Sequence, residues 1–242
     1  MHRVLLCNSA ASFYVKILQT LWQFEDEGIL MKSSLINDVA IRALLEAYRT
    51  KTCGPAVGAA LHSMFVTSSP ENKGVVVEAV LRGICLQNDD LLPLWEEAIM
   101  SGIGRSVLRL GVVEHALLNM CIQGDVIVEQ NHQPLVCCIK TALAIPSFNS
   151  EKIRQAIFVK LADSPEQLLP SYISFFRALA EIDKVDTMIY INQMTGILKE
   201  KRCFNMALQA AIYDFIDHLK RRSKQNIYKE PYFQAFSEKW LF

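Results

Sequence analysis

The side chains best suited to catalysis or metal binding are scattered along this chain. Its five histidines have no paired spacing of the HExxH kind, and its seven cysteines form no CxxC pair. Nucleophilic triads and metal sites need several such groups close together, which no stretch of the sequence provides. We therefore expect no catalytic residue, no metal site and no cofactor, and an all-helical enzyme is the less favoured alternative.

Three short patterns resemble reactive sites, and each has a structural explanation. Cys137 and Cys138 lie inside an apolar run, where thiols pack as small hydrophobic groups. Glu96 and Glu97 are adjacent, so on a helix they point about 100° apart and cannot flank one substrate bond. The segment 102–106, GIGRS, resembles a phosphate-binding loop, but it follows a predicted helix and lacks the Walker lysine. We interpret this segment as a link that ends a helix.

The most regular helical pattern, residues 204–224, ends in a basic cluster. Apolar residues recur there at helical spacing, which predicts a helix with one buried face. The basic residues that follow the apolar stripe are Lys220, Arg221, Arg222 and Lys224. Positive charge suits the C-terminal end of a helix dipole, so this basic tip is a solvated helix end, a nuclear-import signal or a contact for an acidic partner. A nucleic-acid-associated module that uses Lys220–Lys224 is the main alternative function.

Aromatic side chains are concentrated in the last predicted helix, residues 231–240. Phe233, Phe236 and Trp240 have the spacing to share one face of an amphipathic segment. They either cap the preceding helices or dock into a groove of a partner protein.

Composition and charge argue against several classes of protein. Lys plus Arg and Asp plus Glu both number 25, so the formal net charge is zero, whereas dedicated nucleic-acid binders usually carry a basic excess. Hydrophobic residues make up 51% and charged residues 21%, which argues against disorder over most of the length. No apolar run has the length of a signal peptide or a membrane-spanning helix. We therefore expect no membrane association and a reducing compartment, the nucleus or the cytoplasm.

The apolar periodicity predicts about twelve helices and no reliable strand. Their expected ranges are 9–25, 34–50, 55–65, 75–86, 91–100, 106–122, 134–145, 150–162, 171–182, 185–201, 204–224 and 231–240. Residues 68–73 are expected to form a turn and residues 125–130 a loop or short helix, and Pro170 is expected to kink or restart a helix. The helix centres fall about every 20 residues, which favours antiparallel neighbours stacked in sequence.

A weak internal repeat supports this stacking. Residues 78–89, EAVLRGICLQND, align with residues 114–125, EHALLNMCIQGD, at an offset of 36, and Glu46 and Cys53 fit the same frame. A period near 34 suits a unit of two helices whose second helix faces a common core. The spacing predicts a single domain over residues 1–242 made of hairpins at about 9–50, 55–87, 90–123, 132–162, 165–200 and 205–241.

The hairpin length, the helix spacing and the repeated block resemble the HEAT and armadillo families of α-solenoids. The Trp-Leu-Gly-Tyr signature of tetratricopeptide repeats and the Thr-Pro-Leu-His signature of ankyrin repeats are absent. The resemblance implies an all-α, right-handed superhelix of about six antiparallel hairpins that serves as a non-catalytic scaffold or adaptor for other proteins. The first predicted helix is apolar around its circumference, so we expect it to contact an upstream repeat array, another chain or a second copy. If that contact is with an upstream array, the chain is one part of a longer repeat protein.

Overall fold

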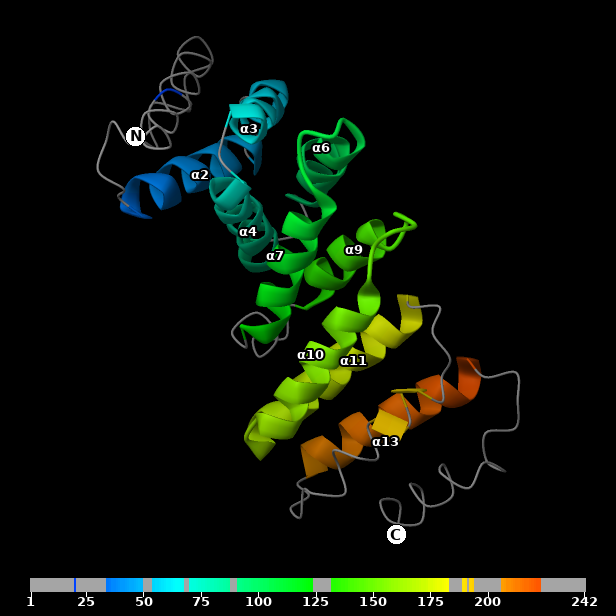
Figure 1. Cartoon of the computed structure of the whole chain (residues 1–242). Coiled ribbons are helices and arrows are strands. Elements are labelled where there is room, and N and C mark those ends of the chain that lie inside the picture. Colours follow the sequence, from blue (N-terminus) through cyan, green and yellow to red (C-terminus); the bar gives the residue numbers. More distant parts are fainter. Residues whose placement is uncertain are drawn as a thin grey trace. The chain divides into compact units, whose positions relative to one another are not determined.

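The computed structural model describes residues 20, 34–49, 54–67, 70–87, 91–123, 132–182, 189–190, 192–193 and 206–222. These residues are mostly helical, and no strand occurs among them (Figure 1). The predicted all-α class is therefore confirmed for this part of the chain. Four predicted segments lie wholly or mostly outside it, namely the helices 9–25, 185–201 and 231–240 and the segment 125–130.

The chain divides into two compact units, which are described separately below. Unit 1 comprises residues 1–120 and 137–148, and unit 2 comprises residues 121–136 and 149–242. The right-handed superhelix of about six hairpins stays a prediction.

The helices of unit 1 pack with their neighbours and also with the helices two places away in the chain. α2 spans Ser34–Arg49, α3 spans Gly54–Thr67 and α4 spans Pro70–Gln87. α2 packs against both α3 and α4. α3 and α4 in turn contact η2, the helical segment at Trp95–Met100.

The repeated sequence block occupies matching positions on α4 and on α7, the helix at Leu110–Ile122. The residues at an offset of 36 that are buried on both helices are Val77 and Val113, Val80 and Ala116, Leu81 and Leu117, Ile84 and Met120, and Cys85 and Cys121. Their spacing is that of the buried stripe of an amphipathic helix. α4 and α7 therefore bury the same positions of the repeated sequence.

The start of α4 differs from the prediction. The sequence predicts a turn over 68–73, but α4 begins at Pro70. Proline is tolerated in the first turn of a helix because its missing N–H would have no acceptor within the helix there. Pro70 therefore marks the start of α4 and does not belong to a turn that reaches residue 73.

The helix predicted over 91–100 is longer and less regular than expected. α5 (Leu92–Leu94), η2 and α6 (Ser101–Gly104) follow one another without a break, and η2 is a π-helix. A π-helical turn inserts an additional residue into the helical repeat, which apolar periodicity alone does not indicate. α9, at Gln133–Ala142, is shorter than the predicted 134–145 because the chain turns after Ala142.

The segment 102–106 ends a helix, as the sequence predicts, but the turning residue is a serine. Ser106 has a φ of 61°, the left-handed conformation that usually favours glycine. Its N–H donates to the Ile103 carbonyl at 2.9 Å, and the Val107 N–H donates to the Gly102 carbonyl at 3.0 Å. These two bonds form the Schellman pattern of a helix C-terminus. Consequently α7 begins at Leu110 and not near residue 106.

Unit 2 is built around α11, Leu169–Ile182, which contacts α10 (Ser150–Asp163) and α13 (Met206–Arg222) (Figure 1). A short 3-10 segment, η3 at Glu166–Leu168, precedes α11. The helix thus restarts just before Pro170, as predicted.

An aromatic cluster fills the space between these three helices. The Phe176 ring of α11 meets the Phe158 ring of α10 edge-on, with ring centroids 4.3 Å apart. The same Phe176 ring stacks with the Phe215 ring of α13 at 5.7 Å and lies 4.7 Å from the Tyr190 ring. Aromatic pairs in these arrangements stabilise a core beyond the area they bury. Phe176 therefore connects α10 to α13.

Candidate functional site

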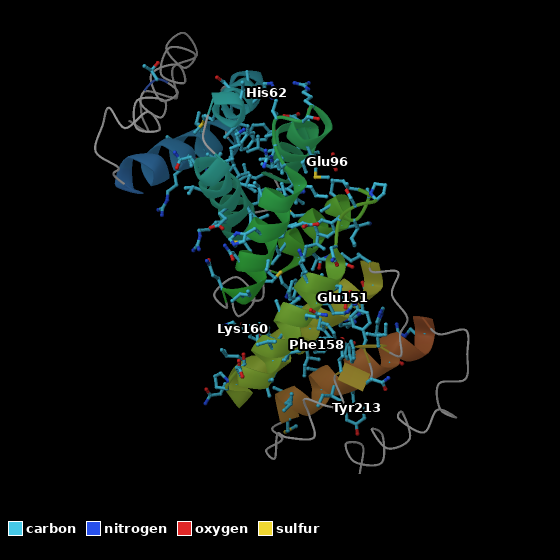
Figure 2. The ribbon with its side chains drawn as sticks, viewed as in Figure 1. His62, Glu96, Glu151, Phe158, Lys160 and Tyr213 are labelled. Atoms are coloured by element: carbon cyan, nitrogen blue, oxygen red, sulfur yellow. The ribbon has the colours of Figure 1, made fainter. Side chains whose placement is uncertain are left out.

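The regular helix near the C-terminus is confirmed as α13, although its described part is shorter than the predicted 204–224. Leu208, Ile212 and Phe215 are buried, as the apolar stripe predicts. Met206 is 86% exposed and Tyr213 is 48% exposed, so apolar surface also remains on the outer side of this helix (Figure 2). α13 therefore has one face in the core of unit 2 and one face in solvent.

The predicted basic tip contributes less free positive charge than its sequence suggests. Arg221 forms an ion pair with Asp217, one turn earlier on the same helix. Lys220 and Arg222 lie within α13, but their side chains, like Lys224 as a whole, are outside the described residues. Pairing with Asp217 reduces the attraction of Arg221 for a polyanion. Nucleic-acid binding and nuclear import through this tip stay predictions.

The predicted docking aromatics Phe233, Phe236 and Trp240 lie outside the part of the chain that the structure describes. Their roles as a cap or as a docking segment therefore stay open.

A charged network joins α11 to α13, and the sequence does not predict it. Arg177 Nη1 donates to Asp214 Oδ2 at 2.7 Å, and its Nη2 lies 3.3 Å from Glu181 Oε1. His218 Nδ1 lies 3.4 Å from the same Glu181 oxygen. The Arg177, Glu181 and Asp214 side chains are 35%, 46% and 53% exposed, so solvent screens these pairs. The network aligns the two helices more than it stabilises them.

In unit 1 the helices α2, α4 and α7, which we call the helix row, pack side by side. Leu45 of α2 lies against Gly83 of α4, where the absence of a side chain lets the helices approach. On the other side of α4, a Cβ placed on Gly74 would lie 3.9 Å from Val112 Cγ1 of α7. The members of the row therefore touch at glycines.

A polar bridge also joins α4 to α7. Asn119 Nδ2 donates to Glu78 Oε1 at 2.6 Å and lies 3.3 Å from His115 Nδ1. His115 Nδ1 is 3.8 Å from the same Glu78 oxygen. Glu78 opens the repeated block and Asn119 lies inside its second copy, so the bridge connects one copy of the repeat to the other.

The thiols of the described residues are poorly suited to nucleophilic chemistry. Cys85 and Cys138 are buried, and burial raises the pKa of Cys85 to about 12 and raises that of Cys138 further still. Thiolates, not thiols, are the nucleophiles and metal ligands, so these groups behave as small hydrophobic side chains. The core-packing role predicted for the vicinal pair is confirmed for Cys138, while Cys137 is partly exposed. Within the described ranges, no three His, Cys, Asp or Glu side chains are placed to hold a metal ion.

Glu96 lies exposed on η2 (Figure 2), and the adjacent Glu97 is exposed as well. Glu97 Oε2 accepts a hydrogen bond of 3.3 Å from the Tyr48 hydroxyl of α2. Partial burial, and after it the Glu97 charge, raises the pKa of Tyr48 above its ordinary value. Glu97 therefore tethers η2 to α2.

Comparison of the chain with known protein families, with curated proteins and with solved structures found no match. A HEAT or armadillo relationship therefore stays a prediction. Among the described helices, none is long and apolar enough to cross a membrane.

The network and the bridge were missed for different reasons. Arg177 and Asp214 are 37 residues apart, and no sequence spacing predicts which charges meet across two helices. Glu78 and Asn119, in contrast, both belong to the repeated block. If copies of the block are assumed to pack side by side, the polar residues flanking the buried stripe become candidates for a bridge.

Proposed function

We propose that this chain is a non-catalytic scaffold that binds other proteins through the surfaces of stacked helices. The observation that carries the proposal is the helix row, in which α4 and α7 bury the same register of the repeated block and meet through Glu78 and Asn119. Repeats that stack in this way bury one face in a shared core and present another face along the array.

The outer side of the helix row has the mixed composition of a protein-binding surface. Its exposed residues include Arg42, Arg49, Val75, Gly111 and His115. Non-obligate interfaces are about as apolar as the rest of a protein surface and are enriched in arginine. One exposed valine together with exposed polar and charged side chains on the same three helices fits such an interface.

We further propose that the packing continues as a HEAT- or armadillo-like right-handed solenoid of about six hairpins. Contacts between helices two places apart, α2 with α4 and α3 with η2, support this extension because stacked hairpins place alternate helices side by side. In this proposal the first helix contacts an upstream array or a second copy. The cysteines that the structure describes, at positions 85, 121, 137 and 138, are not paired in disulfides, which fits a reducing compartment, the nucleus or the cytoplasm.

Affinity purification of the intact chain with quantitative mass spectrometry tests the proposal. Truncation at the N-terminus would be a poor test, because α2 packs on α3 and α4 and its loss would expose the core of unit 1. The informative variant is Val75→Arg on α4, where the valine is 46% exposed. Val159→Arg on α10, at a valine that is 60% exposed, is the matched control in unit 2.

We expect Val75→Arg to reduce recovery of at least one partner about tenfold, and Val159→Arg to leave that recovery unchanged. Circular dichroism checks that both variants keep their helical content. Failure of the wild-type chain to recover any stable partner would remove the main support for a scaffold. Equal recovery by all three proteins would exclude the helix row as the binding surface.

A further inference from the structure

The loop between α6 and α7 is an exposed basic segment of unit 1. Arg105, Ser106 and Arg109 are exposed along it. A Cβ placed on Gly104 or on Gly111, at its two ends, would meet no atom within 4 Å. The chain at both ends of the loop therefore borders open space.

Arg105 and Arg109 differ from the other arginines whose side chains the structure describes. The guanidinium group of neither residue forms a hydrogen bond or an ion pair with any described residue. Arg49, Arg177 and Arg221 form ion pairs with carboxylates, Arg154 lies over the Tyr190 ring, and Arg42 and Arg82 are also not without a partner. Acidic and basic residues are equal in number in this chain, so two unpaired guanidinium groups on one short loop are a local excess of positive charge.

The loop is held in one conformation before any partner arrives. Its backbone is fixed by the Schellman bonds at Ser106 and Val107 and by a further bond of 3.1 Å from Leu108 N–H to the Gly102 carbonyl. Lys73 of α4 donates from Nζ to the Val107 carbonyl at 3.1 Å, which anchors the loop to the helix row. Preorganisation lowers the entropy lost on binding.

We propose that the Arg105–Arg109 loop binds an acidic peptide segment of a partner protein. Two guanidinium groups with free donors can each bind a carboxylate through paired hydrogen bonds. Lys73 adds a third positive charge at the Val107 carbonyl of the same loop. A nucleic acid is a poorer fit, because affinity for a phosphate backbone grows with the number of phosphates neutralised and this loop offers few cations. The inference rests on the proposed scaffold function and assigns one contact of that scaffold.

Fluorescence anisotropy of a labelled peptide made of Asp and Glu, titrated with the full chain, tests the proposal. At about 25 mM salt, where screening is weak, we expect saturable binding that weakens at about 150 mM salt. The double variant Arg105→Gln with Arg109→Gln should weaken binding about tenfold. The control, Lys140→Gln with Lys152→Gln, removes the same charge from two exposed lysines on α9 and α10 and should change binding less than about twofold.

Several outcomes would overturn the proposal. Equal loss of affinity in both double variants would mean that net charge alone attracts the peptide, and absence of binding by the wild-type chain would exclude the site. Tighter binding of a single-stranded DNA oligonucleotide through the same two arginines would assign the loop to nucleic acid instead. If partners are recovered from cells while the acidic peptide does not bind, only this inference fails and the scaffold proposal stands.

Discussion

Gly83 is the position where a single methyl group tests the packing of the helix row most sharply. A Cβ placed there would lie well inside van der Waals contact with Leu45 Cδ1, and 3.6 Å and 3.9 Å from Leu45 Cγ and Cδ2. Leu45 is 1% exposed, so its side chain has no solvent into which it can move. Gly83→Ala therefore forces Leu45 to shift inside a packed interface.

Two opposing free-energy terms set the size of the effect. Replacing a helical glycine by alanine stabilises a helix by about 1 kcal/mol. Overpacking a well-packed core costs about 1–3 kcal/mol. We expect the overpacking term to exceed the helix term, so that Gly83→Ala destabilises unit 1 by about 1 kcal/mol. Gly74→Ala on the same helix meets Val112 only at an ordinary 3.9 Å, so it should stabilise by about 0.5–1 kcal/mol.

Urea unfolding followed by circular dichroism at constant m-value measures both effects. A double-mutant cycle isolates the cause, because Leu45→Ala removes the atoms that clash. Leu45→Ala alone should cost about 2–5 kcal/mol as a buried truncation. In that background Gly83→Ala should become stabilising by about 1 kcal/mol. If Gly83→Ala stabilises the wild-type chain as much as Gly74→Ala does, the close approach of α2 and α4 is refuted.

Three further predictions concern a helix cap, a buried histidine and the buried thiols. Asn149 Oδ1 accepts the Glu151 N–H at 3.0 Å at the start of α10, so Asn149→Ala should cost about 1 kcal/mol by urea unfolding while Asn149→Asp should cost less. Burial lowers the pKa of His132, which lies edge-on to Phe175, so the unfolded chain binds the proton first as the pH falls. The contribution of His132 to the free energy of unfolding should therefore be complete above about pH 6.5 and decline below it. When the pH is lowered to about 5.5, the urea midpoint should fall less in His132→Phe than in the wild-type chain. Cys85 should resist Ellman's reagent at about pH 8 in the folded chain and react in urea, because its pKa is raised to about 12.

The sequence predicts the helices well where apolar periodicity is regular. α2, α10 and α13 begin and end within a few residues of their expected bounds, and the buried residues of α13 are those of the predicted stripe. Each of these helices buries one continuous face, so a single period describes it.

The errors occur where local backbone chemistry overrides that period. The π-helical turn at Trp95–Met100 shifts which side chains face the core, and no residue type in this segment predicts such a turn. Ser106, and not Gly102 or Gly104, takes the left-handed conformation, because the hydrogen bonds at the end of α6 fix where the chain turns. The sequence predicts a turn at Pro70, but proline also favours the first position of a helix, and α4 begins there.

The contacts between helices were harder to predict than the helices themselves. The repeated block correctly indicated that α4 and α7 bury the same positions. The hydrogen bond from Asn119 to Glu78 depends in addition on the distance between the two helices, which the sequence does not give. The unpaired state of Arg105 and Arg109 likewise follows from where acidic groups lie in space, which spacing along the chain does not encode.

Hydroxyl-radical footprinting of the chain, free and bound to a recovered partner, tests the scaffold proposal most directly. The exposed side chains Val75 and His115 report on the helix row, and Val159 and Tyr213 report on unit 2. We predict that the partner protects Val75 and His115 from oxidation and leaves Val159 and Tyr213 as reactive as in the free chain. Protection confined to Val159 and Tyr213 would contradict the assignment of the helix row as the binding surface.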